Sequence, residues 1–156
     1  PLHDAASRGQ LEICQLFFEY VKEKNPSVNE GATALHFAAL GGHLAVVCLI
    51  SENTDVKEKN PKDINGQTPL HFAAEKGCVK ICKTIIESLG SNGCKNPKDN
   101  YGTTPLHLAA QSGRVGVFEL ILKLVNDKKP KDNQGITPIE LADGHKNIIR
   151  IYQRFS

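Results

Sequence analysis

The sequence predicts an all-α solenoid of about five stacked helix–turn–helix units within a single domain, residues 1–156. The first observation is that Thr68-Pro69-Leu70-His71 returns unchanged at Thr104-Pro105-Leu106-His107. Looser copies begin at Pro1, Thr33 and Thr137. The second observation is the period, since the second positions of these copies are separated by 33, 35, 36 and 33 residues. The third is that the copies lead into apolar stripes at helical spacing, which a stack of units can bury.

The composition is that of a globular protein, with 40% hydrophobic and 23% charged residues. The longest apolar run, Leu44 to Ile50, is far too short to span a membrane, so no membrane insertion is expected. No basic-then-apolar leader precedes it, and free cysteines fit a reducing compartment. We therefore expect an intracellular, cytoplasmic, monomeric domain. The chain opens inside a motif copy without Met, which suggests a piece of a longer protein.

The unit that starts at Asp63 shows how each element is predicted. Residues 63–66 have the composition of a β-turn, and Gly66 can take a positive φ. Thr68 can cap a short helix that begins at Pro69, because proline suits the first helical position. The apolar residues of this helix lie at i, i+3 and i+4, and Gly77 is a stop signal just after it.

A longer helix is predicted next in the same unit. Its apolar stripe is broad and its opposite face carries lysine and glutamate, as expected for a helix with one buried side. The stripe comprises Val79, Ile81, Cys82, Ile85 and Ile86. Residues 90–93 end this helix with glycine, serine and asparagine. Such a unit cannot bury its apolar face alone, but it can do so against copies of itself.

The remaining units follow the same order of turn, short helix, reversal and longer helix. The units are expected at residues 1–27, 28–62, 63–98, 99–131 and 132–156. The first long helix is expected to bury Leu11, Ile13, Leu16 and Phe17. The last unit departs from the pattern, since its glycine comes early and its final helix, around Ile148 to Phe155, carries added polar residues. A polar terminal unit is typical of a stack that needs a cap.

The chain resembles the ankyrin repeat family over nearly its whole length. Thr-Pro-Leu-His-x-Ala-Ala-x-x-Gly occurs intact at residues 68–77 and 104–113. The resemblance implies a curved stack of helix pairs with β-turn fingers projecting roughly at right angles. It also implies protein recognition without catalysis. The finger of the second unit is expected to be less regular, because Ala34 and Val28 replace the usual proline and finger aspartate.

A lysine–proline segment recurs before the fingers, at residues 59–63, 95–99 and 129–132. Its proline is expected to stop the preceding helix and to stiffen the finger. Ten of the 19 Lys and Arg residues lie near these loops, which could form a basic edge. Eight acids are interspersed, and no aromatic-plus-arginine pattern for base stacking accompanies them, so nucleic-acid binding is not favoured.

Histidine recurs at one repeat position, in His3, His36, His71 and His107. Units packed about 10 Å apart cannot share a metal ion through these rings. We therefore expect each imidazole to hydrogen-bond a neighbouring backbone group.

Cysteine raises a second question of metal binding, because Cys78 and Cys82 are four residues apart. However, Cys14 and Cys82 occupy a position that holds Val47 and Phe118 in other units. That substitution pattern favours an apolar filler over a metal ligand. No third group recurs beside a Cys–His pair to orient it for catalysis.

The expected function is non-catalytic binding of a protein or peptide, with no cofactor. Phosphate-binding glycine loops and a Gly-x-Ser-x-Gly elbow are both missing from the sequence. Alternatives are a regulatory segment of a larger channel or enzyme, and binding of an acidic partner or nucleic acid through the lysine-rich edge. A designed repeat protein is disfavoured because the repeats vary in length and at many frame positions.

The resemblance places the binding surface on the finger tips and on the exposed side of the short helices. At the finger tips the positions are Asn29, Glu30, Ala32, Ile64, Asn65, Gln67, Asn100, Tyr101, Thr103, Asn133, Gln134 and Ile136. On the short helices they are Leu40, Glu75, Lys76, Gln111 and Ser112. Tyr101 and Ile64 are the expected anchors, since an aromatic or aliphatic group within a polar rim often dominates binding.

Overall fold

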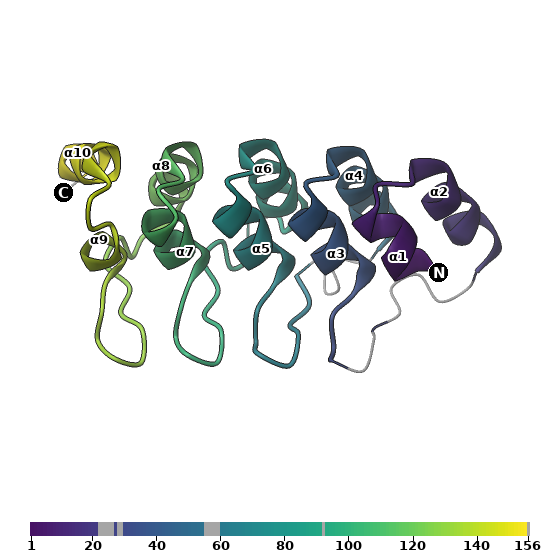
Figure 1. The fold of residues 1–156 in the computed structure, drawn as a ribbon, viewed down its shortest axis with the longest axis horizontal. Coiled ribbons are helices and arrows are strands. Elements are labelled where there is room, and N and C mark those ends of the chain that lie inside the picture. Colours follow the sequence, from purple (N-terminus) through teal and green to yellow (C-terminus); the bar gives the residue numbers. More distant parts are fainter. Residues whose placement is uncertain (22–26, 28–29, 55–59, 92, 156) are drawn as a thin grey trace.

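The computed structural model describes residues 1–21, 27, 30–54, 60–91 and 93–155, and these form ten helices arranged as five pairs. The helices are α1 (Leu2–Ser7), α2 (Leu11–Tyr20), α3 (Ala34–Gly41), α4 (Leu44–Asn53), α5 (Pro69–Lys76), α6 (Val79–Ser88), α7 (Pro105–Gln111), α8 (Val115–Leu124), α9 (Pro138–Leu141) and α10 (Lys146–Phe155). The short helices form one row, the long helices form a second row above it, and loops hang below the short helices (Figure 1). The predicted all-α solenoid is confirmed.

The short helices α3, α5, α7 and α9 each begin where a capping box satisfies the first N–H groups. At Thr33, Thr68 and Thr104 the partner three residues on is a histidine, and at Thr137 it is a glutamate. Proline stands at the first position of α5, α7 and α9, as predicted. Gly77 ends α5 at a φ of 82°, a conformation that only glycine adopts at little cost.

The core is one apolar seam that runs through all five pairs. The short helices bury a leucine and two alanines in each of the first four units, and the small alanines let neighbouring helices approach closely. The long helices bury most of the predicted stripes, with Ile81, Ile85, Phe118 and Ile121 fully enclosed, but the prediction is wrong for Val79, which lies at the first turn of α6 and is 40% exposed. Each helix packs mainly on its partner in the pair and on the equivalent helices of adjacent units. The stack is therefore stabilised by contacts between neighbours.

The predicted stripe of α2 is only partly buried. On α2, Leu11 and Phe17 are half-buried, whereas Ile13 and Leu16 are exposed. The expectation that all four would be enclosed is wrong for the last two. The reason is that α2 has α4 on one side and, among the described helices, none of its own row on the other side.

The fingers are hydrogen-bonded turns that project from the N-termini of the short helices (Figure 1). In the third unit, Asp63 N–H donates to Gln67 O at 2.9 Å, and Gly66 N–H donates to Asp63 O at 2.9 Å. The expectation that proline stops the preceding helix is wrong, because α6 ends at Ser88, well before Pro97. In the second unit Val28 lies outside the described residues, and α3 starts at Ala34 with its threonine cap intact.

The last pair differs from the others as the sequence predicted. Helix α9 is a single turn of four residues, and α10 buries Ile148 while its outer face carries Arg150, Gln153 and Arg154. Within the part of the chain that the structure describes, every helix is too short or too polar to traverse a lipid bilayer.

Candidate partner-binding surface

The fingers of the third, fourth and fifth units are each held in shape by one aspartate. The Asp63 carboxylate accepts the N–H groups of Asn65 and Gln67 through one oxygen, at 2.9 and 2.8 Å. Asp99 and Asp132 make the same pair of contacts in the next two fingers. These three carboxylates therefore accept hydrogen bonds from the backbone of their own turns, as aspartate commonly does.

The fingers are also joined to one another across the stack. Asn100 N–H donates to Asn65 O, and Asn133 N–H donates to Tyr101 O, both at 2.9 Å. The side-chain amides add a second bond at each step, from Asn100 Nδ2 to Ile64 O at 2.9 Å and from Asn133 Nδ2 to Asn100 O at 3.0 Å. Ile64 N–H extends the series to Glu30 O at 2.8 Å.

Two lysines reinforce this finger ladder, by which we mean the hydrogen bonds between residues 30, 62–65, 98–101 and 131–133. Lys62 Nζ donates to Lys98 O at 2.9 Å, and Lys98 Nζ donates to Lys131 O at 2.7 Å. Both side chains are exposed, so their positive charge stays in contact with water. Lys62 and Lys98 thus carry a charge and also hydrogen-bond the backbone of the next finger.

The repeated histidines connect each unit to the next one. His71 Nδ1 accepts the N–H of Thr68 at 3.0 Å, so the proton of the neutral ring must sit on Nε2. Nε2 then donates to Thr103 O of the following finger at 3.2 Å. His36 and His107 make the equivalent contacts to Gln67 O and Ile136 O, both at 3.1 Å. The predicted backbone partners are confirmed for these three histidines.

Burial keeps these imidazoles neutral. Loss of solvent is the largest influence on the pKa of His36, His71 and His107, and it lowers each pKa below the ordinary value of 6.5. The carbonyl that each Nε2–H contacts opposes this shift only in part. In the last unit Glu140 replaces the histidine, and its carboxylate accepts the N–H and hydroxyl of Thr137 at 2.7 and 2.6 Å.

The cysteines behave as apolar fillers where the sequence predicted it. Cys14 and Cys82 are fully buried, and burial raises the pKa of the Cys82 thiol to about 12. Cys94 is exposed. Within the described ranges, no three His, Cys, Asp or Glu side chains are grouped in a way that could hold a metal ion.

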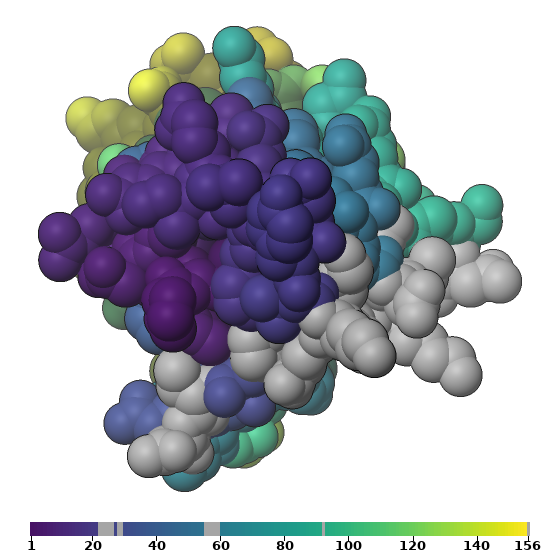
Figure 2. All heavy atoms as spheres, turned by 90° about the vertical axis from the view of Figure 1, so that its right-hand side faces the viewer, coloured from purple at the N-terminus to yellow at the C-terminus, as the bar shows by residue number. Residues whose placement is uncertain are grey.

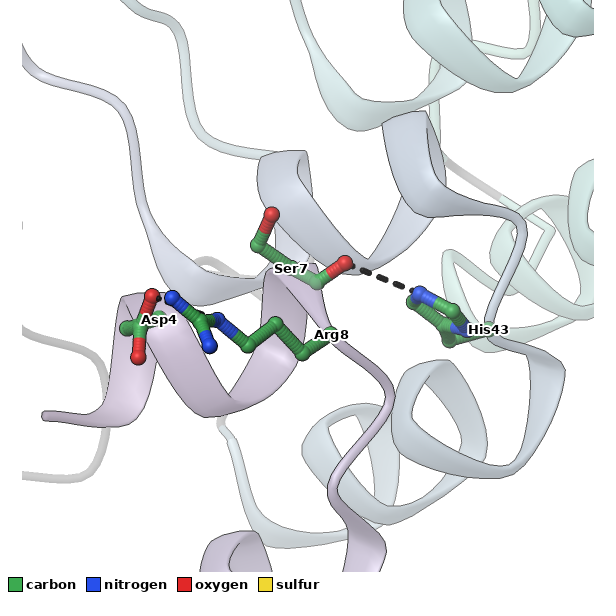
Figure 3. Close-up of polar contacts among 4 residues, drawn as sticks. All are labelled: Asp4, Ser7, Arg8 and His43. Carbon is green, nitrogen blue, oxygen red and sulfur yellow. Dashed lines mark hydrogen bonds and ion pairs between the residues drawn. The ribbon is translucent and has the colours of Figure 1, made fainter.

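The reversal between short and long helix carries a further contact between units. His43 Nε2 donates to Ser7 O, the carbonyl near the end of α1, at 2.9 Å (Figure 3). Arg114 Nε and His145 Nε2 donate in the same way to Glu75 O and Gln111 O, at 2.9 and 3.1 Å. A helix leaves its last carbonyls without internal partners, and these side chains satisfy one of them.

Most of the predicted binding positions lie on the outer surface, and a minority do not. The exposed ones are Glu30, Leu40, Ile64, Asn65, Glu75, Lys76, Asn100, Tyr101, Gln111, Asn133 and Gln134. The half-buried ones are Ala32, Gln67, Thr103, Ser112 and Ile136. Asn29 lies outside the described residues. Gln67, Thr103 and Ile136 give their N–H to an aspartate and their C=O to a histidine, so their backbone belongs to the frame of the stack.

The exposed apolar groups at the finger tips are Ile64 and Tyr101, which are 65% and 66% exposed. They stand on adjacent fingers that the ladder joins, since Asn100 bonds both Ile64 O and Asn65 O. Their side chains are therefore held on a hydrogen-bonded support.

Sequence reasoning missed that Asn100 and Asn133 use their side-chain amides within the molecule. It also missed the donors at His43, Arg114 and His145. A usable signal existed for the second group, since each follows the glycine that ends a short helix, at equal repeat positions. The signal for the asparagines is weaker, because Ile64 occupies the same position in the third unit.

The fold defines the class of protein: a solenoid of stacked helix pairs whose fingers are hydrogen-bonded to one another along one edge. A family model described as ankyrin repeats in three copies matches residues 1–60 and 45–132. The chain belongs to the ankyrin-repeat family, whose members are generally protein–protein interaction modules and typically non-catalytic. A search of curated proteins found none that matches the chain.

Proposed function

We propose that this domain binds a protein or peptide through the concave face formed by the fingers and the short helices. The observation that carries the proposal is the pair of exposed apolar side chains, Ile64 and Tyr101, on adjacent fingers whose backbones are bonded to each other. Exposed apolar groups on an ordered, hydrogen-bonded support favour binding, because little conformational entropy is lost when a partner arrives.

The partner chemistry follows from what surrounds these two anchors. Glu75, Lys76 and Gln111 lie exposed on the short helices, and Asn65 and Gln134 lie exposed at the finger tips. Both charges and neutral amides are present, so the rim is polar without one dominant sign. A polypeptide with one or two apolar side chains and hydrogen-bonding groups beside them suits such a surface.

The test compares partner capture by the wild-type domain and by variants. Tyr101→Ala should weaken binding by at least about 1 kcal/mol, the usual threshold for a contributing contact, without changing the thermal midpoint. Tyr20→Ala is the matched control, because Tyr20 is an equally aromatic and still more exposed residue of α2 in the row of long helices. Unchanged binding after combined substitution of Ile64, Tyr101 and Gln111 would contradict binding through the concave face.

The lysine-rich edge is the alternative binding surface. The salt dependence of binding distinguishes it from the concave face. Binding through Lys62, Lys98 and Lys131 to an acidic partner or nucleic acid should weaken steeply as salt rises, because bound counterions are released on association. Binding through Ile64 and Tyr101 should change little up to physiological salt. The measurement is the dissociation constant of the captured partner across a salt series.

A further inference from the structure

The surface between α6 and α8 is hollowed along the second half of both helices. Their first turns lie close together, since a Cβ added to Gly116 would stand 2.9 Å from Val79 Cγ2. Further along, a cavity of about 370 Å³ opens between Ile86, Leu120 and Leu124. Pockets that hold small ligands have volumes of this order and a similarly apolar lining.

A second cavity continues the first one toward the loops. It has a volume of about 400 Å³ and lies between the loop after α6 and the loop after α8. Both cavities are lined by Ser91, Lys95 and Leu124, so they are continuous. The second has polar groups in its lining, among them Asn96 and Asp127. We call the two cavities together the α6–α8 groove, in which an apolar half meets a polar half at Lys95.

The apolar half of the groove reaches the surface at Leu124, which is 40% exposed. At the same position α4 and α6 end in the polar residues Asn53 and Ser88. The groove belongs to the row of long helices, away from the short helices and fingers (Figure 1). Seen from the N-terminal end, teal atoms from the region of α6 and the loop after it stand out past the first two units (Figure 2). The groove is therefore separate from the concave face.

Lys95 is the charged group at the centre of the groove. It is half-buried, whereas Lys83 and Lys98, which also line the groove, are exposed. Lys98 Nζ already donates to Lys131 O at 2.7 Å. Among the described residues, the Lys95 ammonium has no hydrogen-bond or ion-pair partner. A half-buried cation of this kind favours an anionic ligand, because removing a charge from water is costly unless the charge is paired.

The two carboxylates of the groove are engaged elsewhere. Glu87 Oε1 lies 3.7 Å from Lys83 Nζ, and Asp127 Oδ1 accepts the N–H of Lys129 at 2.9 Å. With three lysines and two carboxylates, the lining has a net charge of +1. The charge that remains for a ligand is therefore that of Lys95.

We propose that the α6–α8 groove binds a small amphipathic carboxylate. Its apolar tail lies on Ile86, Leu120 and Leu124, and its acid group contacts Lys95. Removal of the tail from water supplies most of the affinity. The ammonium adds a charge-assisted hydrogen bond, which selects an acid over a neutral molecule with the same tail.

The experiment uses decanoate as the probe, below the concentration at which it forms micelles. An NMR titration of the isotope-labelled chain measures the dissociation constant and locates the amides that respond. We expect saturable shifts in the second halves of α6 and α8 and in the loops that follow them. Decanol has the same tail without the charge and should bind at least about threefold more weakly. Acetate, which has the charge without the tail, should give no saturable shifts.

Substitutions within the groove separate the two contributions. Lys95→Gln should weaken decanoate binding at least about threefold and leave decanol binding unchanged. Lys80→Gln is its matched control, because Lys80 is an exposed residue of α6 outside the groove and the change in net charge is the same. Leu124→Ser should weaken both ligands at least about fourfold, since the tail loses apolar contact. Ile149→Ser, at an exposed aliphatic residue of α10, is the control for this change.

Three results would overturn the proposal. The first is the absence of saturable decanoate binding, and the second is binding whose shifts map to other helices. The third is equal affinity of the wild-type chain for decanoate and decanol, which would show that Lys95 does not select an acid. None of the three depends on the folding of a variant.

Discussion

At the scale of single residues, the buried histidines tie stability to pH. His36, His71 and His107 stay neutral in the folded chain at pH values where the unfolded chain takes up protons, since burial lowers the pKa of each. Their contribution to stability is complete above the ordinary pKa of 6.5 and is lost as the pH falls from there through the lowered folded pKa. Protonation would also place a hydrogen on Nδ1, where Thr68 N–H already donates to His71.

Chemical denaturation at about pH 7 and at about pH 5 measures this effect, because the interval brackets the ordinary imidazole pKa. We expect a lower free energy of unfolding at the acid end. His71→Gln should shrink the difference, because glutamine can complete the capping box without titrating. An equal loss in the variant would show that other groups dominate the acid response.

Core residues should tolerate truncation poorly. Leu70 is completely buried in the seam between α5 and its neighbours, so Leu70→Ala should cost roughly 2–5 kcal/mol by opening a cavity. Leu124→Ala serves as the comparison, since that side chain is exposed and should cost less than about 1 kcal/mol. Denaturant titration of both variants measures the difference, and equal stabilities would contradict the burial of Leu70.

The thiols should differ sharply in reactivity. The thiolate is the reactive form, and burial raises the pKa of Cys82 to about 12 while it also shields the sulfur. Cys94 is exposed and should be alkylated first in the native protein. Peptide mass spectrometry after timed alkylation tests the order, and labelling of Cys82 before Cys94 without denaturant would contradict it.

At the scale of elements, the finger ladder should make neighbouring fingers depend on one another. Asn100→Ala removes the Nδ2 bond to Ile64 O while the backbone bond to Asn65 O remains. The expected cost is about 0.5–1.5 kcal/mol, the net value of a typical hydrogen bond. Hydrogen exchange at the amides of residues 64–67 should accelerate in this variant, and Gln134→Ala, at the exposed tip of the last finger, provides the control position.

The elements themselves were predictable because their signals are local. Thr68, Pro69 and Gly77 bound α5 through cap chemistry that acts within a few residues, and the same signals recur at each copy. The prediction that Pro97 stops the preceding helix is wrong. A proline shows only where a helix cannot continue, and α6 ends earlier, at Ser88. Asn96, in the same segment, instead accepts the N–H of Leu106 at 3.0 Å and so helps to begin α7.

The contacts that depend on a neighbouring unit could not be predicted from the sequence. The donor side chain of Asn133 and the exposure of Ile13 both follow from the distance to an adjacent unit, or from the lack of one among the described residues. No spacing within one repeat contains that information. The binding positions on the concave face stay a prediction for the same reason, since they depend on a partner.

At the scale of the whole molecule, each pair contacts chiefly its immediate neighbours. Destabilising one end should therefore leave the far end intact. Ile148→Asp places a charge in the fully buried anchor of α10, and we expect rapid hydrogen exchange in α9 and α10 with retained protection in α3 to α6. Uniform loss of protection throughout the chain would show that the stack unfolds as one unit.

The same nearest-neighbour arrangement decides how the domain would respond to force. Junctions arranged one after another carry tension in series, so each bears the full load and the weakest one yields first. The last junction keeps the contact of His107 Nε2 with Ile136 O, but its short helix, α9, is a single turn of four residues. A pull applied at the two termini should therefore peel α9 and α10 away first and extend the chain stepwise.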